Sequence, residues 1–276
     1  MIYYRCFESF VLLLVWLLVQ CPLIIAKLPS TITPCARNEP LLERCIINAV
    51  YQIRPLLGHG NLGDGFTIPP LEPLSLDNIE LRLSSQFQAV FTDLEANGGS
   101  NFVIERLIAK PLDTSYDLWI TLPRIDFRGK YSLHLNLLLL DIKGRGNMQG
   151  HCENAKAFVK IRGSRYLRNG KDYVKFTKMT MRIDFKTFKL NLANLFSGDR
   201  VLGDVGNRLI NNNQELYLKE IETSIEHSLS KKFLDVANKI LASATFDEMF
   251  PHGKTFINPI THPPRLPSSG VSPAIF

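Results

Sequence analysis

Cysteine is scarce in this chain, and the common catalytic signatures are missing from it. Five cysteines occur among 276 residues. There is no H-E-x-x-H sequence, which would hold a catalytic zinc, and no G-x-S-x-G turn, which would present a nucleophilic serine. No second Cys or His pair stands at the spacing of zinc ligands. We therefore expect no enzyme activity, no catalytic residue, no metal and no cofactor.

A second long apolar run is also missing. The single run, Phe10 to Val19, follows Arg5 and precedes a small residue, Ala26. This layout is typical of a secretory signal peptide. The run is shorter than the roughly 20 apolar residues of a membrane span. We predict that residues 1–26 are a signal peptide and that the mature protein is secreted and extracellular, with an uncleaved N-terminal anchor as the alternative.

Two of the three cysteines outside this leader stand close together. Secretion favours oxidation, so we expect Cys35 and Cys45 to form a disulfide. In one continuous helix their Cα atoms would be about 15 Å apart, and a disulfide tolerates at most about 7 Å. Cys35 should therefore precede a helix whose N-cap is Asn38 and whose first turn contains Pro40. Cys152 is left as a free thiol, which we expect to be buried rather than reactive.

The excess of positive charge is small. The chain has 32 basic and 26 acidic residues, a net charge of +6. One group of basic residues alternates with apolar residues or lies in a turn: Arg162, Arg165, Arg168, Lys171, Lys175 and Lys178. This pattern is typical of a solvated strand face, so we expect no nucleic-acid partner. It leaves open a weak contact with anionic membrane surfaces.

The middle of the chain indicates an antiparallel sheet. A short helix is predicted from about Glu39 to Leu57, followed by a loop rich in Gly and Pro. Apolar residues then recur with a period of two, which predicts strands near 79–92, 102–108, 116–122, 131–139, 157–161 and 179–185. Successive strands with one apolar face indicate a meander. Within it, the stretch KGRGNMQG predicts a turn with a bulge, and Asn169-Gly170 predicts a hairpin turn.

A different pattern follows the sheet. Residues 203–244 contain no proline and carry an apolar stripe with a period near 3.6. Its members are Leu209, Leu216, Ile221, Ile225, Leu229, Phe233, Val236, Ile240 and Ala244. A single helix of this length would extend about 60 Å. Such a helix and the concave face of a curved sheet can cover each other, which predicts an α+β fold. Residues 251–276 are rich in Pro and Ser and predict a disordered tail.

Several stretches, taken in order, resemble the insect takeout and juvenile-hormone-binding protein family of secreted carriers. They are LPSTITPCARNEPLLERC, IPPLEPL, ITLPRIDFRGKYSLHLNLLLLDIKGRGNM, LANLFSGDRVLGDVGNRLINNNQE and FLDVANKILASATFDEMFP. The resemblance extends to about Pro251. It implies a long C-terminal helix wrapped by a strongly curved antiparallel sheet, with an apolar tunnel between them. Gln214 stands where the family usually has Trp, and Cys152 lacks the partner for a second disulfide, which places the chain nearer the broader takeout group.

These observations predict one carrier domain over residues 27–250, which binds a small hydrophobic ligand such as a terpenoid, fatty acid or other lipid. We expect a monomer. The expected lining of the tunnel is Phe87, Phe91, Phe102, Ile104, Tyr131, Leu133, Leu135, Leu137, Met179, Met181, Ile183 and Phe185 from the sheet, with Leu209, Leu216, Ile221 and Ile225 from the helix. Tyr131 could offer its hydroxyl to a ligand. Ordinary core packing is the competing interpretation for most of these residues.

Two other functions remain open at this point. One is a lipid-transfer module that docks on membranes through its basic face and its Pro-rich loop. The other is an extracellular signalling or interaction protein whose core is filled by its own side chains.

Overall fold

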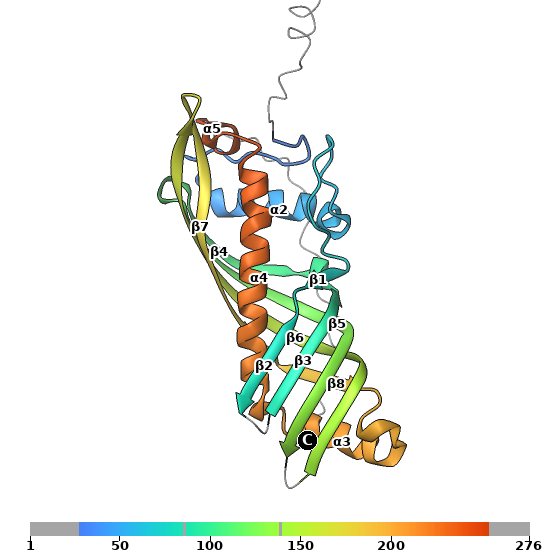
Figure 1. The fold of residues 1–276 in the computed structure, drawn as a ribbon. Helices are drawn as coiled ribbons and strands as arrows, with labels where there is room; N and C mark the ends of the chain where they lie inside the picture. Colours follow the sequence, from blue (N-terminus) through green and yellow to red (C-terminus); the bar gives the residue numbers. More distant parts are fainter. Residues whose placement is uncertain (1–27, 85–86, 138–139, 254–276) are drawn as a thin grey trace, which may run out of the picture.

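The computed structural model describes residues 28–84, 87–137 and 140–253. The predicted signal peptide and almost all of the predicted tail lie outside these residues. Figure 1 shows a strongly curved antiparallel sheet and one long helix, α4 (Leu218–Leu241), that runs along its concave side. The α+β architecture predicted above is confirmed. None of the helices in the described ranges is both long and apolar enough to span a bilayer.

The sheet is built around two long central strands. Its strands are β1 (Leu74–Leu76), β2 (Ile79–Ser84), β3 (Phe87–Asn97), β4 (Val103–Lys110), β5 (Ser115–Leu137), β6 (Leu140–Arg168), β7 (Lys171–Asp184) and β8 (Thr187–Leu192). β5 and β6 pair along almost their whole length, from Ser115 opposite Arg162 to Leu137 opposite Leu140. The other edge of β5 pairs with β3 and β4, and the other edge of β6 pairs with β7 and β8. β1 and β2 continue the sheet beyond β3.

The strands differ from those predicted in length and in connection. The predicted strand 79–92 is two strands, β2 and β3, which pair with Ile79 opposite Phe91. The predicted strand 116–122 and residues 131–137 of the predicted strand 131–139 belong to one continuous strand, β5, and residues 138 and 139 lie outside the described ranges. The predicted turn at Asn169-Gly170 is confirmed, because both residues have the left-handed backbone that such a hairpin turn requires, with φ of 52° and 73°.

The predicted turn with a bulge at KGRGNMQG is wrong, because the stretch lies inside β6 and pairs continuously with β5. Its glycines are needed for close packing rather than for a turn. A Cβ atom on Gly146 would come within 2.6 Å of the Ala193 carbonyl oxygen, and one on Gly150 would come within 2.2 Å of the Lys189 carbonyl oxygen. Any larger residue would push β8 and the residues after it away from β6.

The N-terminal helix and the disulfide lie at one end of the sheet. Helix α2 (Leu42–His59) begins after Leu41, so Asn38 is not its N-cap and Pro40 precedes the helix. Cys35 and Cys45 form the predicted disulfide, with their Cα atoms 5.9 Å apart. The disulfide fastens the segment before the helix to its first turn, as the distance argument required.

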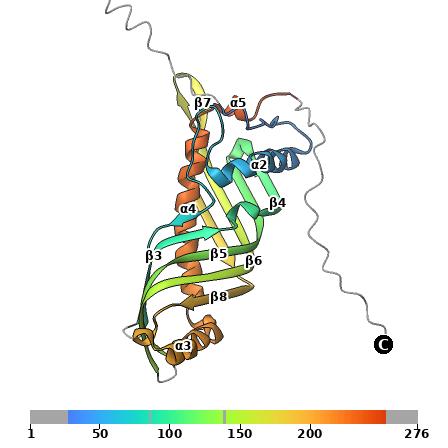
Figure 2. The same ribbon diagram turned by 90° about the vertical axis from the view of Figure 1, so that its right-hand side faces the viewer.

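The predicted single helix over residues 203–244 is wrong, because it consists of two helices. Helix α3 (Arg200–Asn212) and α4 are separated by a short 3₁₀ turn, η4 (Gln214–Leu216). At the break, Asn213 Nδ2 donates to the Leu209 carbonyl oxygen at 2.7 Å, and the Tyr217 hydroxyl donates to the Ile210 carbonyl oxygen at 2.9 Å. The Leu209 carbonyl also accepts from the Asn213 backbone N–H at 3.1 Å, so the Asn213 side chain adds a second hydrogen bond there, and the Tyr217 hydroxyl gives the Ile210 carbonyl a partner beyond the end of the helix. Figures 1 and 2 show α3 turned away from α4 at one end of the molecule, beside β8.

Candidate ligand-binding cavity

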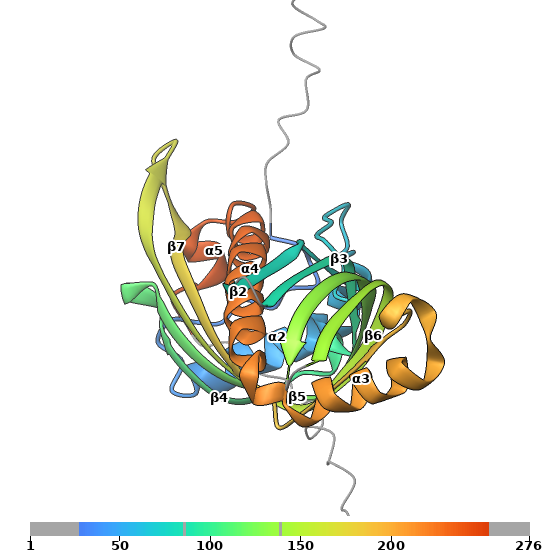
Figure 3. The same ribbon diagram turned by 60° about the horizontal axis from the view of Figure 1, so that its bottom comes forward.

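A cavity of about 460 Å³ lies between α4 and the concave face of the sheet. This volume is within the roughly 300–1,000 Å³ range of small-molecule sites. Figure 3 shows α4 lying inside the curl of the sheet, with α2 across one end. The helices contribute Val50, Ile53, Leu57, Ile221, Ile225, Leu229, Phe233, Val236, Ala237 and Ile240 to the wall. The two central strands contribute Leu118, Ile120, Leu122, Ile125, Phe127, Met148, Cys152, Ala155, Ala157 and Val159.

The wall offers apolar contact and almost no polar chemistry. Glu95 is the one charged residue among the described lining residues, and its carboxylate pairs with Arg128 at 2.6 Å. The Cys152 thiol is buried, and its burial raises its pKa to about 11, which keeps it protonated and unreactive near neutral pH. In the ranges that the structure describes, no three His, Cys, Asp or Glu residues group closely enough to hold a metal ion.

The apolar stripe of α4 faces the cavity. The six stripe residues predicted between Ile221 and Ile240 are all in the lining. Polar side chains of the same helix bind the edge of β7. Glu226 Oε1 accepts from the Ile183 backbone N–H at 2.8 Å, and Asn238 both accepts from the Phe176 N–H at 2.8 Å and donates to the Phe176 carbonyl oxygen at 2.9 Å. The helix is therefore held by its flank while its apolar face covers the cavity.

The structure brings many of the predicted lining residues together around this cavity. These are Phe91, Phe102, Ile104, Met179, Met181, Ile183 and Phe185 from the sheet side, with Ile221 and Ile225 from α4. They come from segments more than a hundred residues apart in the sequence. Most lie on the concave face of the sheet or on the apolar stripe that faces it, and Phe102 and Phe185 lie directly beside the ends of β4 and β7.

Four predicted lining residues lie elsewhere. Tyr131, Leu133 and Leu135 are buried in the core with Ile142, and Leu209 packs against the same core. The Tyr131 hydroxyl donates to the Ala193 carbonyl oxygen at 2.6 Å, so it holds the segment after β8 instead of facing a ligand. Burial raises the pKa of this hydroxyl to about 12. The side chains of the remaining three, Phe87, Leu137 and Leu216, lie outside the described part of the structure.

Other lining residues were missed at the sequence level. Val50, Ile53 and Leu57 of α2 close one end of the cavity, and Ala155 and Ala157 of β6 leave room for it. The period-two pattern predicted a strand in the region of β6, and the helical period predicted a helix in the region of α2. Neither pattern tells which helix will lie across a curved sheet, so no local signal identified these residues as part of the wall.

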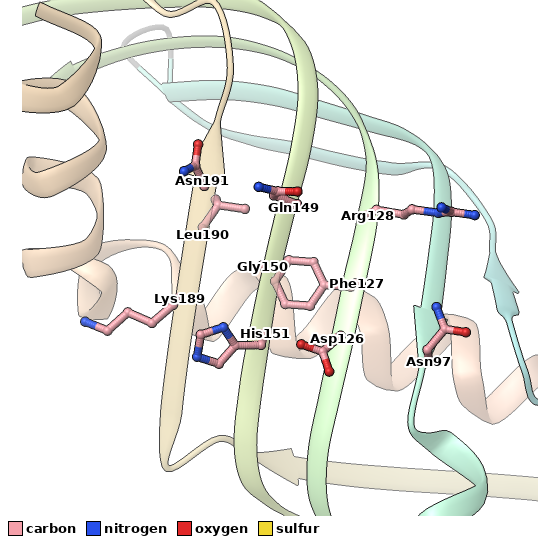
Figure 4. Close-up of a pocket in the computed structure, with 10 residues that line it drawn as sticks. All are labelled: Asn97, Asp126, Phe127, Arg128, Gln149, Gly150, His151, Lys189, Leu190 and Asn191. Atoms are coloured by element: carbon pink, nitrogen blue, oxygen red, sulfur yellow. The ribbon is translucent and has the colours of Figure 1, made fainter. Parts of the chain in front are cut away.

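A second depression lies on the outer face of the sheet, as Figure 4 shows, with a volume of about 510 Å³. Its rim is polar and carries both signs of charge, with Asp126, Arg128, His151 and Lys189. Arg124 forms ion pairs with Asp126 at 2.7 Å and with Glu153 at 2.8 Å. Hydrogen bonding from Arg124 lowers the pKa of the Asp126 carboxyl. Two charges of this rim are thus paired with residues outside it, Asp126 with Arg124 and Arg128 with Glu95.

The outer depression and the cavity share part of one wall. Phe127 and Leu190 line both. The Phe127 ring stacks on Phe188, with ring centroids 5.4 Å apart, and it lies beside Gly150, where a Cβ atom would come within 2.5 Å of the ring. The absence of a side chain at Gly150 therefore lets this ring close the cavity toward the outer face.

Comparison with known proteins identifies the family. Residues 12–251 match the family described as Haemolymph juvenile hormone binding protein (JHBP). The chain belongs to this family. Among proteins related to this JHBP-family chain, the circadian clock-controlled protein daywake of Drosophila yakuba is 23% identical over 194 residues, which cover 66% of this chain and 75% of that protein. Daywake of Drosophila melanogaster is 22% identical over the same length.

A solved structure shows the same fold. Takeout 1 of Epiphyas postvittana superimposes with a TM-score of 0.68 at 22% sequence identity, over 79% of this chain and 98% of that chain. The takeout resemblance drawn from the sequence is confirmed. At this identity the structural similarity of the two proteins establishes a shared architecture, and the JHBP family name adds that hydrophobic-ligand binders belong to this group.

Proposed function

We propose that this JHBP-family protein is a secreted, monomeric carrier that holds one small hydrophobic ligand in the cavity between α4 and the sheet. The ligand class is a terpenoid, a fatty acid or another lipid. The observation that carries the proposal is the wall of the cavity, which is apolar except for Glu95 among its described residues. The presence of a cavity favours this function over an interaction protein whose core is filled by its own side chains.

The size of the hydrophobic effect supports useful affinity without polar recognition. A ligand that buries about 15 carbon atoms gains roughly 12 kcal/mol at about 0.8 kcal/mol per methylene. Association costs at least about 4 kcal/mol. The remaining free energy of about 8 kcal/mol corresponds to a Kd near 1 μM. Because the wall selects mainly by size, affinity should rise about fourfold per added methylene until the cavity is full.

Binding to the cavity can be tested with an apolar fluorescent probe. The secreted protein is titrated with N-phenyl-1-naphthylamine, and terpenoid esters and fatty acids of increasing chain length are then used to displace it. We expect saturable binding of one probe molecule per chain and displacement at micromolar concentrations. A protein that shows no saturable probe binding, and that carries no lipid in native mass spectra after secretion, would overturn the proposal.

Two neighbouring residues provide a matched pair of variants. Ala157 lines the cavity, whereas Lys156 beside it is exposed on the outer face of β6. Ala157→Phe reduces the free volume and should weaken probe binding at least about tenfold, since it displaces roughly two or more methylene contacts. Lys156→Phe should bind the probe like the unmodified protein. Thermal unfolding of both variants separates a filled cavity from a damaged fold.

Secretion has its own test. Expression of residues 1–276 in insect cells, followed by N-terminal sequencing of the protein in the medium, should give a chain that begins at Lys27. Retention of the intact leader on a membrane-bound product would show an anchor instead. Gel filtration of the secreted protein should give a monomer.

A further inference from the structure

The hairpin between β6 and β7 projects from the body of the molecule and exposes apolar side chains at its tip. Figures 1 and 3 show it extending beyond the C-terminal end of α4. Leu167 is 76% exposed, which makes it the most exposed of the large hydrophobic residues in the described ranges, and Tyr166 beside it is 37% exposed. The Asn169-Gly170 turn follows directly. We call residues 162–178 the basic hairpin.

The basic hairpin contains most of the excess positive charge of the chain. Its residues include six Arg or Lys and one acid, Asp172, a net charge of +5, compared with +6 for the whole chain. Arg162 and Arg165 are paired with acids, at 2.7 Å and 3.2 Å. The three lysines of this hairpin are exposed and make no ion pair with any described residue: Lys171, Lys175 and Lys178. Lys171, beside the turn, and Lys175, on the same strand, therefore give the outer part of the hairpin uncompensated positive charge, whereas Lys178 lies at its base opposite Arg162.

The base of the hairpin is firmly packed, so its tip is held in place. Val174 is buried in a small core with Phe246 of the short helix α5 (Phe246–Met249). The Arg165 guanidinium lies 4.9 Å from the centre of the Phe246 ring, and the Arg168 guanidinium lies 3.9 Å from that of Tyr173. Arg168 also donates to the carbonyl oxygen of Ala242 at the end of α4, at 3.2 Å. The tip is thus a preformed projection and needs no folding step on binding.

We propose that the basic hairpin docks the protein on membranes that contain anionic lipid. Leu167 and Tyr166 enter the interfacial region, where an apolar side chain and an aromatic ring are both stabilised, and Lys171 and Lys175 lie against the headgroups. Each basic residue near such a surface increases binding about fivefold. A soluble polyanion would use the lysines but would gain nothing from Leu167, which is why the tip favours a membrane.

Docking in this way connects the membrane to the cavity of the carrier. β7 leaves the hairpin at Lys178 and continues directly into Met179 and Met181, which line the cavity. The hairpin would therefore hold the adjacent end of the cavity near the bilayer, where hydrophobic ligands partition. Surface binding itself requires only the hairpin, so it can be tested separately from the carrier function on which its physiological purpose rests.

The test is flotation of the full mature chain with two kinds of vesicle. One is phosphatidylcholine alone, and the other contains about 30% phosphatidylserine, which supplies the negative surface potential that basic segments need. We expect binding to the anionic vesicles, with a steep loss between low salt and about 0.3 M salt because screening shortens the reach of the charges. The neutral vesicles should bind weakly or not at all.

Two variants of the hairpin have matched controls on α3, at the other end of the molecule. Lys171→Glu combined with Lys175→Glu should weaken binding to anionic vesicles at least about tenfold. Arg200→Glu combined with Arg208→Glu makes the same change in net charge and should have less than a twofold effect. Leu167→Ser should weaken binding about fivefold without changing the charge. Its control is Val201→Ser, because Val201 is 73% exposed on α3.

Three outcomes would overturn the proposal. The first is that the unmodified protein fails to bind anionic vesicles at low salt. The second is that the charge variants of the hairpin and of α3 lose binding equally, which indicates only a nonspecific net-charge effect. The third is that Leu167→Ser keeps full binding while a sulfated polysaccharide competes for the lysines, which indicates a soluble polyanion as the partner. Probe binding in the cavity should be unchanged in every variant, so a failure here is distinct from a failure of the carrier function.

Discussion

Asn207 binds the backbone of Leu192 as a neighbouring strand would. Its Oδ1 accepts from the Leu192 N–H at 2.8 Å, and its Nδ2 donates to the Leu192 carbonyl oxygen at 3.0 Å. One turn later on α3, Asn211 makes the same pair of hydrogen bonds with Leu190, at 2.9 Å and 2.7 Å. Asn238 of α4 makes the same pair of hydrogen bonds with the backbone of Phe176 in β7. Two helices thus close the edges of the sheet with side chains, which keeps unpaired backbone groups from being exposed.

These asparagines should be important for stability. The double variant Asn207→Ala, Asn211→Ala leaves two N–H groups and two carbonyls of β8 without their partners, so we expect the free energy of unfolding to fall by about 2–4 kcal/mol. Asn212→Ala is the control, because Asn212 is exposed on the same helix. Its effect should stay within about 0.5 kcal/mol in urea unfolding. Equal effects of the two changes would contradict the role given to the strand edge.

The disulfide should stabilise the N-terminal segment of the domain and also helix α5 near its C-terminus. Replacing Cys35 and Cys45 by Ser opens a loop of 10 residues. We expect a loss of about 2–3 kcal/mol from the greater freedom of the unfolded chain. Because the Cys35 N–H also donates to the Met249 carbonyl oxygen at 3.1 Å, amide exchange should increase in α5 as well. If the melting temperature of the unmodified protein does not change when dithiothreitol is added, the disulfide does not contribute this stability.

Cys152 should react slowly in the native protein. Its thiol is buried in the cavity wall, and its pKa is raised to about 11, so little thiolate exists at pH 8. Alkylation by iodoacetamide at pH 8 should be at least about a hundredfold slower in the folded protein than in urea, because the thiolate is the reactive form. A bound ligand should slow it further, since Cys152 would then contact that ligand. Rapid labelling of the folded, ligand-bound protein would contradict both the burial and the placement.

The pH dependence of stability should contain a contribution from Glu222 on α4. Burial is the largest cause that raises the pKa of this carboxyl, and the charges of Asp184 and Glu226 add to it. The folded protein therefore holds this proton more tightly than the unfolded chain does. The stability that this provides is complete below the ordinary carboxyl pKa of about 4.3 and is lost as the pH rises through the raised value.

Glu222→Gln should consequently raise the urea midpoint at pH 7.5 relative to the unmodified protein and have a smaller effect at pH 4. We expect a gain below about 1 kcal/mol, because Glu222 is only partly buried and solvent screens its charge. Glu105→Gln removes an equal charge from an exposed site on β4 and serves as the control. A midpoint that rises equally at both pH values would show that the change acts through packing rather than through titration.

Much of the fold could be predicted because it depends on local periodicity. The stripe from Ile221 to Ile240 needs only a helical period to be recognised, and the strands need only alternation. The end of α3 was missed although it has a local signal, the three consecutive residues Asn211, Asn212 and Asn213. Asparagine competes with helical hydrogen bonds through its own side chain, and Asn213 does so at the break.

The glycines of β6 and the role of Tyr131 could not be predicted in this way. Gly146 allows the Ala193 carbonyl to come close, and Gly150 allows the Lys189 carbonyl and the Phe127 ring to do so. These contacts join segments tens of residues apart in the sequence. The Tyr131 hydroxyl likewise binds a carbonyl 62 positions away. A glycine in a strand has the same local appearance as a glycine in a turn, because only the neighbour that approaches it differs.

The sequence alone therefore determined the alternation of the strands, the apolar stripe of the last long helix and the pairing of Cys35 with Cys45. It also predicts the signal peptide. These features follow from the spacing of side chains along the backbone, which the chain carries wherever it folds. Which apolar residues face the cavity and which fill the core was decided only by the tertiary structure. The curvature of β5 and β6 places Ala157 beside open space and Leu133 against other side chains, although both belong to the same period-two pattern.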